Sequence, residues 1–182
     1  DLSADFRLKS AELYEKTYGA KHPEPKRLEE AVYGLPELNR VKIAKADLVA
    51  CPGCYPTTAI LGLAPAIRSG LVTGEGMVIS SMSGVSGAGK KVEAGYLFAE
   101  CNENLKAYGL PHHRHRPEIE QELSTLAGSA IRVSFLPHLA PLNRGMLTTI
   151  SFPLVKGTRA EALEKVYRSF YEKEQAVRVL SG

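Results

Sequence analysis

Apolar positions recur with helical spacing shortly after residue 54. They follow the spacing i, i+3, i+4 and i+7, which is typical of one helix face: Ile60, Leu63, Ala64 and Ile67. Pro56 suits the first turn of such a helix, and Gly70 suits the residue just past its end. We therefore predict a helix between these two residues, which Pro65 should kink or divide.

Two further helices are expected in the second half of the chain. One begins near Pro117 and ends at Gly128, with Ile119, Leu123 and Leu126 on one face. The last begins at Thr158, because Thr158 and Glu161 have the spacing of a capping box. Its apolar stripe comprises Leu163, Val166, Tyr167 and Phe170.

Short apolar runs bounded by turn residues indicate strands at 48–50, 76–81, 131–136 and 146–155. Helices and strands therefore mix along the chain without a complete set of βαβ units. We predict the α/β (α+β) class, with a mixed sheet and helices packed against it.

Composition narrows the class of protein. The 182 residues are 44% hydrophobic and 24% charged, which is typical of a globular chain with one core, or one domain plus part of another. No apolar run is long enough for a membrane span, and a net charge of +3 does not indicate a nucleic-acid partner. Three cysteines, an odd number, favour a reducing, cytoplasmic compartment.

Cys54 is the first chemical candidate. It follows a strand and a Pro-Gly turn and precedes a helix, and free N–H groups at a helix N-terminus favour a thiolate. The alternative is a small buried cysteine that only packs there. Cys51 and Cys54 also form C-x-x-C, but two further zinc ligands at suitable spacing are missing, and a dithiol redox centre is a minor possibility. We expect no metal.

A glycine-rich loop follows the strand at 76–81. Residues 84–91 nearly match a phosphate loop, but Lys91 stands where a hydroxyl would hold magnesium, so a nucleoside triphosphatase is not expected. Gly87 and Gly89 would still allow a ligand close to the backbone. A plain flexible loop is the alternative.

Residues 112–118 hold the second group of candidates. Arg114 suits an anionic substrate group, while His115 precedes a helix whose first turn contains Glu118. Glu118 is placed to orient the His115 imidazole, which gives a cysteine, a base and an orienting acid. The alternatives are a solvated basic surface and a Glu118 that only caps the helix. Farther on, His138 and Arg144 either line a pocket or are structural.

In combination these stretches resemble N-acetyl-gamma-glutamyl-phosphate reductase of arginine biosynthesis. The matching segments run in order over most of the chain: 1–8, 33–38, 52–57, 83–89, 113–115, 117–119, 137–139 and 144–146. The resemblance implies the catalytic, dimer-forming domain of reductases similar to glyceraldehyde-3-phosphate dehydrogenase, in a homo-oligomer (dimer or tetramer).

The resemblance also implies an NADPH-dependent reductive dephosphorylation. Cys54 would attack the acyl phosphate of N-acetyl-gamma-glutamyl phosphate, and the thioester would be reduced by hydride to the semialdehyde. His115 would be the general base and then the acid, held by Glu118. His113, Arg114 and Arg144 would contact substrate or phosphate. Gly87 and Gly89 would lie near the nicotinamide.

The chain departs from the family in three respects. Cys51 replaces the usual Asn, the N-terminal glycine-rich nucleotide fingerprint is missing, and the C-terminal segment is missing. We therefore interpret residues 1–52 as the remnant of the NADP-binding domain and 53–182 as the catalytic domain, incomplete at its C-terminus. By itself this piece should turn over negligibly. The alternatives are a reductase of the aspartate-semialdehyde type, or an inactive dimerisation and substrate-binding module.

Overall fold

The computed structural model describes residues 1–180. The first fifty residues form a small unit around two parallel strands, β1 (Val32–Tyr33) and β2 (Val49–Ala50). The helices of this unit are α1 (Ala11–Tyr18), η1 (Pro25–Leu28) and α2 (Pro36–Ile43). Strand β2 leads directly into the segment that carries Cys54, as the sequence predicts.

The remainder is built on a four-stranded sheet with the order β4-β5-β3-β6. Its strands are β3 (Met77–Ser83), β4 (Lys106–Ala107), β5 (Val133–Leu139) and β6 (Met146–Ser151). Strands β3 and β5 are parallel and start in register at Met77 and Val133, whereas β4 and β6 are antiparallel to their neighbours. The predicted mixed sheet is confirmed.

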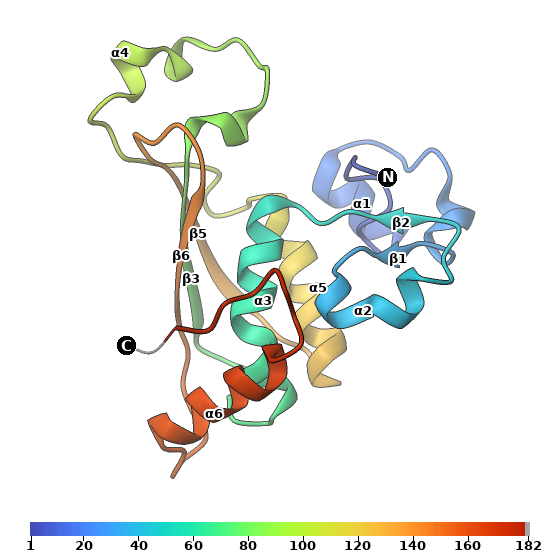
Figure 1. Ribbon diagram of the computed structural model, residues 1–182. Helices are drawn as coiled ribbons and strands as arrows, with labels where there is room; N and C mark the ends of the chain where they lie inside the picture. Colours follow the sequence, from blue (N-terminus) through green and yellow to red (C-terminus); the bar gives the residue numbers. More distant parts are fainter. Residues whose placement is uncertain (181–182) are drawn as a thin grey trace.

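Two helices pack on one side of this sheet (Figure 1). They are α3 (Cys54–Arg68) and α5 (His115–Ala127), and α6 (Ala160–Tyr171) lies against α3. The core between helices and sheet is fully buried and apolar, with Ile60, Leu63, Ile79, Ile119 and Leu123 at its centre. Both α3 and α5 begin at the same end of the sheet, so their N-termini can form one site.

Helix α3 is continuous through Pro65, so of the two predicted effects, a kink or a division, the division is wrong. Proline lacks the N–H that would bond to the carbonyl four residues earlier, on Leu61. The hydroxyl of Tyr171 on α6 donates a hydrogen bond to that carbonyl at 2.6 Å. A contact from another helix therefore satisfies the group that Pro65 leaves free.

The predicted capping box at Thr158 is also wrong, although the helix is real. Helix α6 begins two residues later, with Arg159 as its N-cap and no side-chain cap. Between β3 and α5 the chain leaves the core as an excursion, residues 85–109, with short helices η2 (Val85–Ala88), η3 (Ala94–Tyr96) and α4 (Phe98–Cys101). Within residues 1–180, no helix is long and apolar enough to cross a membrane.

Candidate active site

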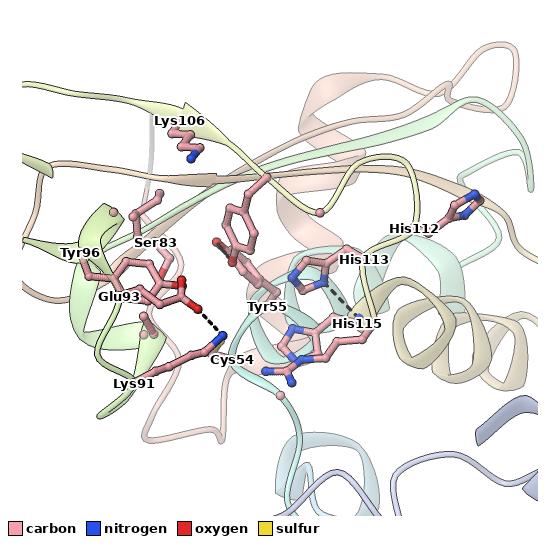
Figure 2. Close-up of a pocket in the computed structure, with 18 of the residues that line it drawn as sticks. Cys54, Tyr55, Ser83, Lys91, Glu93, Tyr96, Lys106, His112, His113 and His115 are labelled. Atoms are coloured by element: carbon pink, nitrogen blue, oxygen red, sulfur yellow. Dashed lines mark hydrogen bonds and ion pairs between the residues drawn. The ribbon is translucent and has the colours of Figure 1, made fainter. Parts of the chain in front are cut away.

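A cavity of about 740 Å³ opens where α3 and α5 begin. One wall, here called the nucleophile wall, carries Cys54, His113, Arg114 and His115. The excursion supplies the facing wall, here called the excursion wall, with Lys91, Glu93, Tyr96, Lys106 and Tyr108. Figure 2 shows Cys54, His113 and His115 of the first wall and Lys91, Glu93, Tyr96 and Lys106 of the second around one space. Residues predicted from separate motifs therefore meet in one cavity.

Cys54 is the first residue of α3, and its side chain is exposed in the cavity. The N-cap residue is Gly53, which has no side chain to cap the helix. The first-turn N–H groups and the positive end of the helix dipole therefore act on whatever anion lies there. The sequence-based alternative, a cysteine buried only for packing, does not describe this side chain.

The His115 imidazole lies directly against Gly53. A methyl group on Gly53 would come within 2.7 Å of His115 Nε2, so only glycine permits this approach. The ring is 6% exposed, and this burial, followed by the charges of His113, Arg114 and Arg7, lowers the pKa of His115 to about 3. His115 is therefore neutral at physiological pH, the protonation state that a general base requires, and the lowered pKa also makes it a weaker base than a free imidazole.

Glu118 lies beneath the turn that carries the nucleophile. Its fully buried carboxylate accepts hydrogen bonds from the Gly53 N–H at 2.9 Å and the Tyr33 hydroxyl at 2.8 Å, both on Oε1. Arg7 Nη1 is 3.8 Å from Oε2. Burial raises the pKa of Glu118, which these partners oppose.

The sequence predicts that Glu118 orients the His115 imidazole, and the hydrogen bonds of the two residues bear on that role. Among the described residues, Oε2 of Glu118 and Nδ1 of His115 are both buried without a hydrogen-bond partner. The observed contacts therefore make Glu118 a support of the Gly53–Cys54 backbone, and its action on the imidazole stays a prediction.

His113 is the second histidine of the nucleophile wall. Its Nδ1 accepts the backbone N–H of His115 at 3.1 Å, and its ring meets the edge of Tyr55 at 5.7 Å between centroids. Burial and the nearby Arg114 lower the pKa of His113 to about 4. His113 therefore fixes the start of α5 while presenting a neutral ring to the cavity.

Two of the predicted ligand contacts lie elsewhere. Gly87 lines the cavity, but Gly89 and Arg144 are not among its lining residues. Gly89 has φ +72°, which favours glycine for conformational reasons alone. The backbone of Arg144 packs closely on Gly84, and its side chain is exposed.

Several residues of the site were missed from the sequence. Arg7 lines the cavity, and its Nε donates to the Cys51 carbonyl at 2.7 Å, which fixes the backbone before Cys54. Tyr33 reaches Glu118 across 85 positions of sequence. Neither carries a local signal of chemistry. No group of three His, Cys, Asp or Glu side chains within residues 1–180 is arranged to hold a metal ion.

These features define a cysteine-centred site on a mixed α/β domain, and comparison with known proteins gives its family. Residues 54–182 match the model of the semialdehyde dehydrogenase dimerisation domain, so the chain belongs to that family. The division at residues 52 and 53 stays a prediction.

Curated relatives agree with the resemblance found in the sequence. The chain is 49% identical over 180 residues to N-acetyl-gamma-glutamyl-phosphate reductase of Moorella thermoacetica and 50% identical to that of Akkermansia muciniphila. Each alignment covers 99% of this chain and 52% of the relative. The chain thus spans about half the length of the curated relatives that it matches.

Solved structures agree on the fold. Aspartate semialdehyde dehydrogenase II from Vibrio cholerae superposes with a TM-score of 0.59 at 16% identity, over 76% of this chain and 48% of that one. The enzyme from Francisella tularensis gives the same score and identity over 80% and 54%. At this identity the likeness concerns the fold alone.

Proposed function

We propose that this chain forms the catalytic part of an NADPH-dependent N-acetyl-gamma-glutamyl-phosphate reductase of arginine biosynthesis, acting in the cytoplasm. The observation that carries the proposal is the pairing of an exposed thiol at a helix N-terminus with a buried, neutral imidazole across Gly53. The names of the relatives support the choice of substrate over that of an aspartate-semialdehyde enzyme.

The first chemical step needs only this chain. His115 takes the thiol proton, and the Cys54 sulfur attacks the acyl carbon, so a C–S bond forms. The bond between that carbon and the phosphate oxygen breaks, and inorganic phosphate leaves with its electron pair. Arg114, which lines the same wall, stabilises the charge of the departing phosphate. The product is a thioester on Cys54.

The next stage requires a bound nicotinamide cofactor. The cavity is bounded by Gly87, which has no side chain, and by Ala88, which has only a methyl group, so these residues leave room for a flat ring and fit the nicotinamide end of the cofactor. When bound, NADPH would supply the hydride that reduces the acyl group. This chain's own residues hold the thioester at Cys54 and return a proton from His115 Nε2.

A cofactor-independent assay tests the proposal. Mixing the protein with N-acetyl-gamma-glutamyl phosphate should release one equivalent of phosphate and add one acyl group to Cys54, as seen by peptide mass spectrometry. The Cys54→Ser variant should release phosphate at least about a thousandfold more slowly. The matched Cys51→Asn variant should be mildly affected.

Three outcomes would discard the proposal or its substrate. Equal damage from the two cysteine changes would favour a thiol–disulfide protein. Faster acylation by beta-aspartyl phosphate would favour the aspartate-semialdehyde type. A chain that binds the substrate without releasing phosphate would be a substrate-binding module.

The proposal includes assembly as a homodimer or tetramer. One face of the sheet carries no helix in the described residues (Figure 1). On that face Val78 is 37% exposed, and Leu147 on the neighbouring strand is 59% exposed. Light scattering should give twice or four times the chain mass, and Leu147→Lys should shift it toward the monomer.

A further inference from the structure

The cations that line the cavity differ in whether they are paired. Arg7 faces the buried carboxylate of Glu118, and Lys91 forms an ion pair with Glu93, the only carboxylate of residues 1–180 that lines the cavity. Arg114 and Lys106 have no ion-pair partner within 4.0 Å in residues 1–180. Neither charge is neutralised by direct contact, although Lys106 and the Glu93 carboxylate act on each other from beyond that distance, and both cations line the cavity where a ligand would meet them.

These two charges belong to opposite walls. Arg114 adjoins His113 and His115 on the nucleophile wall, whereas Figure 2 shows Lys106 on the other side of the cavity. Tyr55 and Tyr108 also line the cavity, and the Tyr108 hydroxyl donates to the Tyr55 hydroxyl at 3.0 Å. A ligand that meets both charges must be elongated and anionic at both ends.

The backbone of Lys106 is fixed to the sheet. Strand β4 pairs with β5 at Lys106 and Leu139, and the N–H of Tyr108 donates to the Pro137 carbonyl at 3.1 Å. The side chain itself is exposed in the cavity and carries its charge on a long stem. A compact ammonium of this kind suits a single carboxylate at adjustable distance.

We propose that Lys106 binds a second anionic group of the substrate, a carboxylate remote from the reacting carbonyl. The proposal rests on the function proposed above, whose substrate carries such a carboxylate, and it assigns the recognition of that carboxylate to Lys106. The acyl phosphate lies at Cys54 and Arg114, and the carboxylate lies at Lys106. Lys106 thereby contributes to specificity and takes no part in bond making.

Paired substrates and paired variants test this assignment. Phosphate release in a single turnover is measured with N-acetyl-gamma-glutamyl phosphate and with 4-acetamidobutyryl phosphate, which lacks only the carboxylate. Lys106→Met should lower the second-order rate constant for the first substrate by about tenfold to a hundredfold, the usual cost of a charged contact. The rate at saturation should change little, and Lys106→Arg should restore most of the loss.

The second substrate separates the possible outcomes. Lys106→Met should leave its rate constant unchanged, which also shows that the variant is folded. Equal losses on both substrates would overturn the proposal, because Lys106 would then act on the phosphoryl group or on the fold. Lys90→Met, in the same excursion but outside the cavity lining, should affect neither substrate.

A failure of the proposed function looks different. In that case the unaltered protein acylates Cys54 with neither substrate, so both proposals fall together. If the unaltered protein is acylated by both substrates at equal rates, only the carboxylate subsite is overturned.

Discussion

The two walls of the cavity are built in different ways. The nucleophile wall consists of helix N-termini whose supporting groups are buried, with Glu118 at 0% and His115 at 6% exposure. The excursion wall leaves the core, and apolar side chains beside it remain exposed, such as Val92 at 95% and Phe98 at 81%. The reacting atoms are thus held by packed structure, whereas Lys106, the residue proposed for recognition, has an exposed side chain on the edge strand β4 at the end of the excursion.

Glycines on the two walls give the strongest contrast. Gly53→Ala would place its methyl group 2.7 Å from His115 Nε2, whereas a methyl group on Gly95 of the excursion wall meets nothing within 4 Å. Displacement of the base by about an ångström lowers a rate by about a hundredfold. We expect that loss for Gly53→Ala in the single-turnover assay and little change for Gly95→Ala. Similar effects at the two positions would contradict the contrast.

A tyrosine buried behind the nucleophile wall and a tyrosine on the excursion wall should differ as well. Tyr33→Phe removes one of the two close donors to buried Glu118, at a cost of about 1–3 kcal/mol in unfolding free energy. Because Glu118 also holds the Gly53 N–H, acylation should fall by roughly tenfold. Urea denaturation and phosphate release measure the two effects. Tyr96→Phe is the matched change on the excursion wall, and a comparable loss of stability there would contradict the argument.

Part of the nucleophile wall could be predicted because its signals are local. A strand, a Pro-Gly turn and a helical periodicity place Cys54, and Pro117 places His115 near a helix start. Both helices begin as expected to within two residues. The residues themselves thus gave a nucleophile and a base with a reason for each, and the resemblance then supplied the substrate.

The rest depends on contacts between distant segments. Arg7 and Tyr33 reach Glu118 from the first fifty residues, and no periodicity indicates that. The continuity of α3 through Pro65 depends on Tyr171, more than a hundred residues later. Lys106 is one basic residue among many, and only its place on β4 brings it into the cavity.

Acid should destabilise the folded chain through the two buried histidines of the nucleophile wall. His115 and His113 have pKa values lowered to about 3 and about 4, below the ordinary 6.5, so the unfolded chain binds protons that the folded chain does not. Their contribution to stability is complete above pH 6.5 and is lost as the pH falls from there toward 4. The raised pKa of Glu118 opposes this, because its protonation favours the folded state.

Calorimetry at a series of pH values measures this effect. The melting temperature should fall from about pH 6.5 to about pH 4, and His115→Gln should make the fall shallower. If the melting temperature fell equally steeply with pH in the unaltered protein and in His115→Gln, the His115 ring would be hydrated in the folded chain.

The smallest effect on the acylation rate is expected from a change away from both walls. Such a change should lower the unfolding free energy without slowing acylation. Tyr171→Phe leaves the Leu61 carbonyl of α3 without the hydroxyl that bonds to it at 2.6 Å, which should cost about 1–2 kcal/mol in unfolding free energy. Leu61 is at the middle of α3, about two turns from Cys54, so acylation of Cys54 should stay within about twofold of the unaltered protein. If acylation fell as far as it does in Tyr33→Phe, loss of stability alone would account for both, and the special role of the buried support beneath Cys54 would be refuted.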